Sequence, residues 1–163
     1  MPQRLHILHI ENEPAILDMV RAALIDEMEV DRALSLGAAR EQIAIQSYDL
    51  LLVDLMLDDS VGVDTVNALK GYGIPMVVLS AVDRPEVLAA CAAAGADDYI
   101  LKPGITLLRL LNRLRFAHAR HQRCRENLDE DREWKASKKK RYLDEAALEA
   151  LKPFITCGHL VAA

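Results

Sequence analysis

Short apolar runs alternate with longer amphipathic stretches over the first hundred residues of the chain. The apolar runs have the length of β-strands, and the third and fourth are almost wholly apolar, as expected of strands covered on both faces. The stretches between them carry apolar residues at helical spacing. The expected strands span residues 5–10, 29–34, 49–54, 75–80 and 98–102. The expected helices span residues 15–27, 37–46, 63–70, 85–94 and 106–121.

A strand followed by a helix, repeated five times, predicts an α/β fold. Short connections between parallel strands imply right-handed crossovers and an open, doubly wound, five-stranded parallel sheet of the flavodoxin-like type, with strand order 2-1-3-4-5. Gly71 and Gly73 follow the third expected helix, and Gly95 follows the fourth in the position of a left-handed C-terminal residue. In such sheets, ligands bind beyond the carboxyl ends of the strands.

Two domains are expected: an α/β domain over residues 1–121 and a charged, partly helical C-terminal extension over residues 122–163. Charged side chains dominate the extension as far as residue 141. After that, the stretch YLDEAALEALKPF predicts a short amphipathic helix that stops near Pro153. The extension is too short for a typical DNA-binding or catalytic output domain.

Charge and composition restrict the classes of partner. The net charge of −5 gives no general attraction to phosphate backbones or anionic lipids. The one basic stretch, KASKKKR, is offset by acids upstream, so we expect no direct DNA binding. Three widely spaced cysteines do not form a disulfide framework, and there is no signal peptide or apolar run long enough to span a membrane. We therefore expect a cytoplasmic protein.

Polar side chains of different kinds follow four of the expected strands, and in a parallel sheet they would meet at one edge. The turn after the first strand, IENEP, is acidic where a nucleotide-binding fold would carry glycines, and it would repel phosphate unless a divalent cation lay between them. Mg²⁺, which binds oxygen ligands and keeps several waters, suits this set. The residues are Glu11, Asn12 and Glu13 after the first strand, Asp54 after the third, Ser80 after the fourth and Lys102 after the fifth.

Of these groups, the Asp54 carboxylate is the one suited to attack a phosphoryl group. The Lys102 ammonium would neutralise charge on the phosphoryl oxygens, and the Ser80 hydroxyl would donate a hydrogen bond to one of them. The product would be an aspartyl phosphate, which is a known kind of covalent intermediate.

Over residues 5–121 the chain resembles a two-component response regulator receiver domain of the CheY-like type. The resemblance depends on four motifs in the order that this family shows, each at the end of the corresponding strand. They are the acidic pair Glu11-Asn12, Asp54 in YDLLLVDLML, Ser80 in IPMVVLSA, and Tyr99 and Lys102 in GADDYILKP.

The resemblance implies a signalling switch and not an enzyme. In that family, Asp54 would accept a phosphoryl group from a histidine kinase or a phosphotransfer protein. Ser80 and Tyr99 would form the switch that passes the change to an output partner, which the sequence does not identify. Mg²⁺ would be bound by the side chains of Glu11, Asn12 and Asp54 and by the backbone carbonyl of Met56.

The chain departs from the family pattern at three places. Asn12 stands where a second acid is usual, which removes one charge and predicts weaker Mg²⁺ binding, unless Glu11 or Glu13 compensates. Leu57-Asp58 replaces the usual Met-Pro, and Asp58 adds a negative charge close to the site or a metal ligand through water. Gly104 replaces a usual phenylalanine.

Two other functions stay open. The chain could be a pseudo-receiver, which keeps the fold and acts as a protein–protein interaction module without being phosphorylated. A small enzyme of the haloacid-dehalogenase type also forms an aspartyl phosphate, but it needs a second acid where Met56 stands. A homodimer is conceivable, with Asp97, Asp98, Arg113 and Arg115 as charged partners, although the fourth helix carries too few charges for the usual mode.

Some of these residues also have simpler structural interpretations. The stretch from Glu11 to Pro14 is typical of a helix start, with Asn12 as the cap. His6 and His9, inside the first strand, suggest only a packing role. His118, His121 and Cys124 on the last helix, with the CGH stretch at residues 157–159, form a weak candidate for a second metal site.

Overall fold

The computed structural model describes the backbone of residues 4–156 and the side chains of residues 4–137. Within it the chain divides into two compact units at the junction between His121 and Gln122. The first unit holds the whole sheet. No helix in the described part combines the length and hydrophobicity that a bilayer crossing requires.

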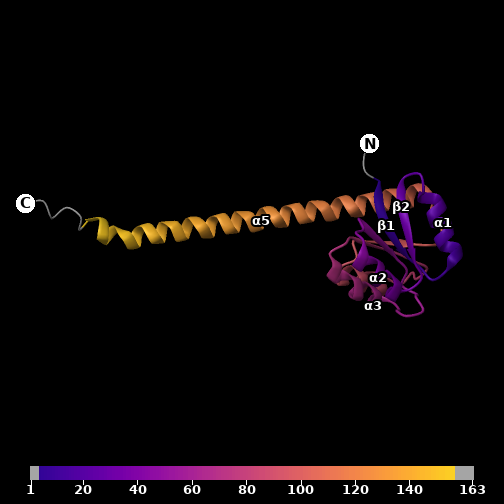
Figure 1. Cartoon of the computed structure of the whole chain (residues 1–163). Coiled ribbons are helices and arrows are strands. Elements are labelled where there is room, and N and C mark those ends of the chain that lie inside the picture. The colour runs from indigo at the N-terminus through magenta and orange to yellow at the C-terminus, as the bar shows by residue number, and fades with distance from the viewer. Residues whose placement is uncertain (1–3, 157–163) are drawn as a thin grey trace, which may run out of the picture. The chain divides into compact units, whose positions relative to one another are not determined.

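The sheet has five parallel strands in the order β2-β1-β3-β4-β5, which confirms the predicted fold. Figure 1 shows the paired strands β1 and β2 side by side. The strands lie within two residues of the predicted bounds: β1 Leu5–Ile10, β2 Met28–Ala33, β3 Leu50–Val53, β4 Met76–Ser80 and β5 Asp98–Leu101. The helices are α1 Pro14–Leu24, α2 Leu36–Ile45, α3 Val63–Leu69, α4 Pro85–Ala94 and α5 Leu107–Thr156, and a 3₁₀ turn, η1, spans Lys70–Tyr72.

Alternate residues of the central strands enter two different cores. In β3, Leu51 and Val53 pack with α2, α3 and α4, whereas Leu50 and Leu52 pack with α1 and the first turns of α5. All four of these side chains are fully buried. Side chains of a strand point alternately to its two faces, so a strand that is apolar throughout must be covered on both sides. The apolar runs in the sequence therefore predicted correctly that helices cover both faces of the sheet.

The starts and ends of the helices follow the sequence in part. Gly95 (φ 109°) has the left-handed backbone predicted after α4, and Gly73 (φ 67°) has the same conformation after η1. Pro14 occupies the first turn of α1, as predicted. The residue that caps this helix is Glu13, without a side-chain hydrogen bond, so the interpretation of Asn12 as the cap is wrong.

The last helix is much longer than predicted. We expected one helix to end near residue 121 and a separate short one to stop near Pro153, but α5 is continuous over 50 residues. No glycine or proline lies between Gly104 and Pro153, and the charged residues there are good helix formers. Lys135 pairs with Asp131 one turn earlier at 2.6 Å. The helix passes Pro153 and ends three residues later, at Thr156.

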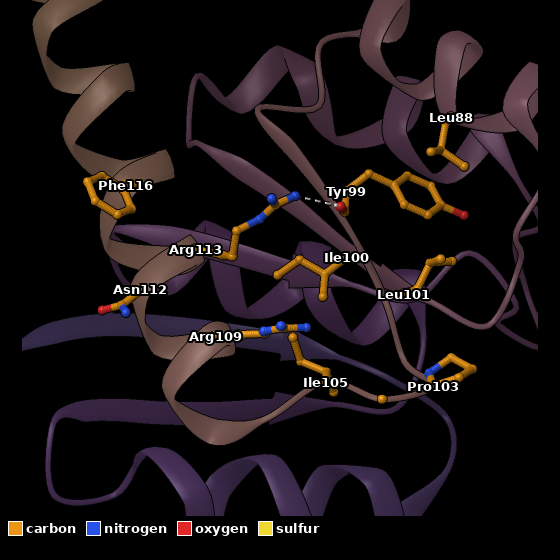
Figure 2. Close-up of a pocket in the computed structure, with 11 residues that line it drawn as sticks. Leu88, Tyr99, Ile100, Leu101, Pro103, Ile105, Arg109, Asn112, Arg113 and Phe116 are labelled. Carbon is orange, nitrogen blue, oxygen red and sulfur yellow. Dashed lines mark hydrogen bonds between the residues drawn. The ribbon is translucent and has the colours of Figure 1, made fainter.

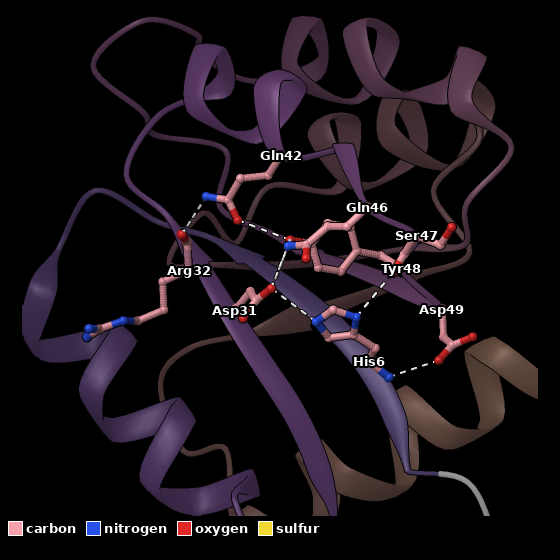
Figure 3. Close-up of polar contacts among 8 residues, drawn as sticks. All are labelled: His6, Asp31, Arg32, Gln42, Gln46, Ser47, Tyr48 and Asp49. Carbon is pink, nitrogen blue, oxygen red and sulfur yellow. Dashed lines mark hydrogen bonds and ion pairs between the residues drawn. The ribbon is translucent and has the colours of Figure 1, made fainter. Parts of the chain in front are cut away.

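A polar network joins the amino-terminal ends of β1 and β3 to β2 (Figure 3). The His6 ring bonds the Asp31 carboxylate (3.0 Å) and the Ser47 carbonyl oxygen (3.1 Å), so its role is not packing alone. Asp31 also accepts hydrogen bonds from Gln46 (2.7 Å) and from the Tyr48 hydroxyl (3.0 Å). Burial and the Asp31 carboxylate raise the pKa of Tyr48 to about 12, so this hydroxyl stays a donor at neutral pH.

Replacement of Tyr48 by phenylalanine should therefore destabilise the protein. Tyr48→Phe removes the buried donor to Asp31, and we expect a loss of about 1 kcal/mol in the free energy of unfolding, measured by urea denaturation. Tyr72→Phe is the matched control, because Tyr72 is exposed on η1. Equal stability of the two variants would contradict a structural role for the Tyr48 hydroxyl.

Candidate functional site

Glu11, Asp54 and Lys102 meet at the carboxyl ends of β1, β3 and β5. The Lys102 ammonium donates to Glu11 Oε2 at 2.6 Å and to Asp54 Oδ2 at 2.9 Å. Glu11 and Asp54 are only 1% and 4% exposed. Two buried carboxylates thus share one ammonium, which leaves one negative charge in excess.

The pKa values of this cluster follow from burial and charge. Burial raises the pKa of the Glu11 carboxyl, Lys102 opposes this effect, and the neighbouring Asp54 charge adds to it. For Lys102, burial alone would lower the pKa, but the hydrogen bonds to Glu11 and Asp54 outweigh it and raise the pKa above its usual value. Lys102 therefore stays charged at neutral pH and compensates part of the acidic pocket.

The loop after β3 places the other groups around Asp54. Asp54 Oδ1 accepts the Leu55 N–H at 2.7 Å, which orients the carboxylate. Met56 forms an antiparallel bridge with Val61. Within the described residues no hydrogen bond engages the Met56 carbonyl oxygen.

Asn12 contacts a residue that is distant in sequence. Its side-chain amide donates to Asp58 Oδ1 at 2.9 Å. Asn12 is half-buried and Asp58 is exposed. The backbone N–H of Glu13 donates to Glu11 Oε1 at 3.2 Å, while the Glu13 side chain is exposed. The loop after β3 thus brings Asp58 to the position beside Asn12.

Of the two predicted switch residues, Ser80 is the last residue of β4 and Tyr99 is the second residue of β5. Ser80 is fully buried, and its hydroxyl oxygen accepts the Val82 N–H at 3.4 Å. The half-buried Tyr99 donates its hydroxyl to the Val82 carbonyl at 2.7 Å. Burial raises the pKa of Tyr99, and the nearby Ser80 side chain opposes the shift. The loop after β4 therefore links the two residues.

A groove of about 610 Å³ lies beside Tyr99, between α4 and the first turns of α5 (Figure 2). The Tyr99 ring extends toward Leu88 of α4, and Arg113 of α5 donates to the Tyr99 carbonyl at 2.9 Å. Phe116 lines the same groove and is exposed. A change in the position of Tyr99 would therefore alter the shape of this surface.

His9 is a residue whose environment we did not anticipate. It is fully buried in β1, and neither of its ring nitrogens has a hydrogen-bond partner among the described residues. Burial, and secondarily the Lys102 charge, lower its pKa to about 3, although Asp54 opposes the shift. Its position in a central, fully covered strand was the sequence signal for burial, but no pattern indicates that the ring stays unpaired.

The weaker sequence candidates have intrachain partners. His121 bonds Asp97 (3.3 Å) and the Gly73 carbonyl (3.2 Å). Among the described residues no group of three or more His, Cys, Asp or Glu side chains is placed to hold a metal ion, which argues against a second metal site with His118 and Cys124. The CGH stretch at 157–159 lies outside the described residues. Arg113 pairs with Asp98 at 2.7 Å and Arg115 with Glu27 at 2.5 Å within the chain.

Comparison with known proteins decides the family. The family model described as "Response regulator receiver domain" matches residues 7–115. The chain belongs to the response regulator receiver family. A receiver domain of two-component systems therefore occupies most of the first unit, as the resemblance of the motifs predicted.

Curated relatives of this receiver domain are longer proteins. The KDP operon transcriptional regulatory protein KdpE of Escherichia coli is 38% identical over 119 residues, which cover 71% of this chain and 52% of that protein. The probable transcriptional regulatory protein TcrX of Mycobacterium tuberculosis is 33% identical over 108 residues, 62% of this chain and 44% of TcrX. The chain spans about half the length of these relatives.

Solved receiver domains have the same fold. A CheY-like receiver domain from Methanospirillum hungatei matches with a TM-score of 0.67 and 26% identity, covering 74% of this chain and 98% of that one. The BeF3-activated receiver domain of RstA from Klebsiella pneumoniae matches with a TM-score of 0.64 and 31% identity, covering 69% and 97%. These matches cover nearly the whole of each solved domain and about seven tenths of this chain.

Proposed function

We propose that this receiver domain is a phosphorylation-dependent switch in which Asp54 accepts a phosphoryl group from a phosphohistidine of a histidine kinase or phosphotransfer protein. The supporting observation is the geometry of Asp54, which is nearly buried at the carboxyl edge of the sheet and shares Lys102 with Glu11. An Asp54 oxygen attacks phosphorus, the P–N bond breaks, and the imidazole leaves with the electron pair and takes a proton. The domain would act as a switch and not as an enzyme.

The residues present fit Mg²⁺, which the family implies. The pocket has one excess negative charge, and Mg²⁺ sites commonly use one or two carboxylates and retain several waters. The ligands would be the carboxylates of Glu11 and Asp54, the Asn12 amide oxygen and the Met56 carbonyl oxygen. Bound Mg²⁺ would neutralise charge between Asp54 and the incoming phosphoryl group.

The chain's own groups complete the proposed chemistry. The Lys102 ammonium already donates a hydrogen bond to Asp54 Oδ2, and after phosphoryl transfer it would donate to the negatively charged phosphoryl oxygens. Ser80 and Tyr99, both bonded to the loop after β4, would respond to that new charge and alter the groove beside α5. The output partner, a cytoplasmic location and the absence of direct DNA binding remain predictions.

The test is the intact mass of the protein after incubation with acetyl phosphate, with and without Mg²⁺. We expect a Mg²⁺-dependent adduct of one phosphoryl group on the wild type and none on Asp54→Asn. A folded protein that forms no adduct with acetyl phosphate or with a phosphorylated kinase domain would overturn the proposal and favour a non-phosphorylated interaction module.

A further inference from the structure

The side chain of Asp58 lies beside Asn12, which stands where receiver domains usually carry a second acidic residue. Asn12 stands at the position of the second acid that the family pattern leads us to expect. Asp58, 46 residues later, accepts a hydrogen bond from the Asn12 side chain at 2.9 Å. The missing charge is thus present beside Asn12, on a different loop.

Backbone hydrogen bonds hold the loop that carries Asp58. The N–H of Leu57 donates to the Ser60 carbonyl at 3.0 Å, and the N–H of Gly62 donates to the Leu55 carbonyl at 2.7 Å. The adjacent Asp59 accepts the N–H groups of Leu36 and Gly37 at the start of α2, both at 2.9 Å. The backbone on either side of Asp58 is therefore held in place by hydrogen bonds.

A carboxylate next to an asparagine selects the orientation of the amide. The oxygen and the NH₂ group of an amide are nearly equal in shape, but a carboxylate only accepts hydrogen bonds. Asp58 therefore favours the orientation in which NH₂ faces it, and this leaves the Asn12 oxygen, which has no hydrogen-bond partner among the described residues. An oxygen is the only amide atom that Mg²⁺ binds.

We propose that Asp58 is a positioning residue for the divalent-cation site: it orients the Asn12 amide with its oxygen toward the cation and supplies nearby the negative charge that the amide lacks. This inference rests on the proposed function, since it concerns the Mg²⁺ that supports phosphorylation. Partners that orient metal ligands change metal affinity by about 10- to 100-fold. Because Asp58 is exposed, we expect an effect of about tenfold.

The experiment measures binding of MgCl₂ alone to the full chain by isothermal titration calorimetry, without a phosphodonor. Asp58→Asn should raise the Kd for Mg²⁺ about tenfold. The double variant Asn12→Asp/Asp58→Asn exchanges the carboxylate and the amide, keeps the total charge, and allows the same hydrogen bond in reverse. It should bring the Kd back toward the wild-type value.

Asp64→Asn is the matched control, because Asp64 is an exposed acid in the first turn of α3. It should leave the Kd for Mg²⁺ unchanged, and thermal unfolding in EDTA should show that all variants remain folded. An unchanged Kd in Asp58→Asn, or an equal rise in Asp64→Asn, would overturn the role of Asp58 and leave the proposed function intact. If the wild type binds no Mg²⁺, both proposals fail.

Discussion

Replacement of Lys102 by methionine is expected to lower the free energy of unfolding of the metal-free protein by about 3 kcal/mol near pH 8. Methionine keeps most of the length of the lysine side chain and removes only the ammonium. Glu11 and Asp54 would then face each other, both buried and without a counter-charge. Removing one partner of a buried ion pair is costly because the remaining charge stays desolvated.

The loss should depend on pH, and its sign follows from Glu11. Burial raises the pKa of Glu11 and Lys102 opposes that rise, so Lys102→Met raises it further. A carboxyl with a raised pKa in the folded state contributes stability that is complete below its unfolded value of 4.5 and is lost as pH rises through the folded value. The variant should therefore approach the wild type near pH 4.5 and diverge from it toward pH 8.

Urea denaturation in EDTA at these two pH values measures the effect. Lys70→Met is the control, since Lys70 is exposed on η1 and its loss should change stability by less than about 0.5 kcal/mol. An equal loss at both pH values for Lys102→Met would show that packing of the side chain, and not compensation of Glu11, is its main contribution.

Sequence patterns predicted the sheet and the central part of the site for the same reason. Apolar runs must be covered on both faces, and parallel strands bring their carboxyl ends to one edge. Glu11, Asp54 and Lys102 follow three different strands, so the sheet alone makes them meet. Their contacts need no information about loops, which is why they were predictable.

The contact between Asn12 and Asp58 depends on a loop and was not predictable in this way. The bridge between Met56 and Val61 sets the path of the loop after β3, and no hydrophobic period encodes such a bridge. Asn12, two residues before Pro14, matched the local pattern of a helix cap, but its side chain forms a long-range hydrogen bond with Asp58 instead. A local pattern is a weak guide where a distant loop offers a charged partner.

The length of α5 shows a different limit. Apolar spacing weakens after Ala117, so hydrophobic periodicity placed the end of the helix near residue 121. Periodicity reports burial against a core, whereas a helix can continue where side chains such as Leu128 and Trp134 are exposed. There, intrinsic helix propensity and ion pairs such as Lys135 with Asp131 maintain the helix.

His9 leads to a prediction of the opposite sign: His9→Leu should stabilise the protein. Both ring nitrogens of His9 are buried without a partner in the part of the chain that the structure describes, and an unsatisfied buried polar group costs about 1–3 kcal/mol. Leucine has a similar volume and suits the apolar core that α1 and α5 form against this face of the sheet. We expect a gain of about 2 kcal/mol in the free energy of unfolding near pH 7.5.

Acid should increase this gain. The pKa of His9 falls from 6.5 to about 3 on folding, so its contribution to stability is present above 6.5 and is lost as pH falls toward the folded value. At pH 5 the His9 ring is protonated in the unfolded wild type and neutral in the folded protein. This adds about 2 kcal/mol to the difference in unfolding free energy between His9→Leu and the wild type. Leucine has no such proton, so His9→Leu should resist acid better than the wild type.

Urea denaturation at both pH values tests this prediction, with His6→Leu as the control from the same strand. His6 bonds Asp31 and Ser47, so its loss should destabilise the protein. If His9→Leu is no more stable than the wild type at either pH, the buried ring nitrogens of His9 do not destabilise the folded protein, which would contradict the prediction. If the gain appears and grows in acid, β1 carries a destabilising residue close to the charges of Asp54 and Lys102, as expected where a site and not stability sets the choice of residue.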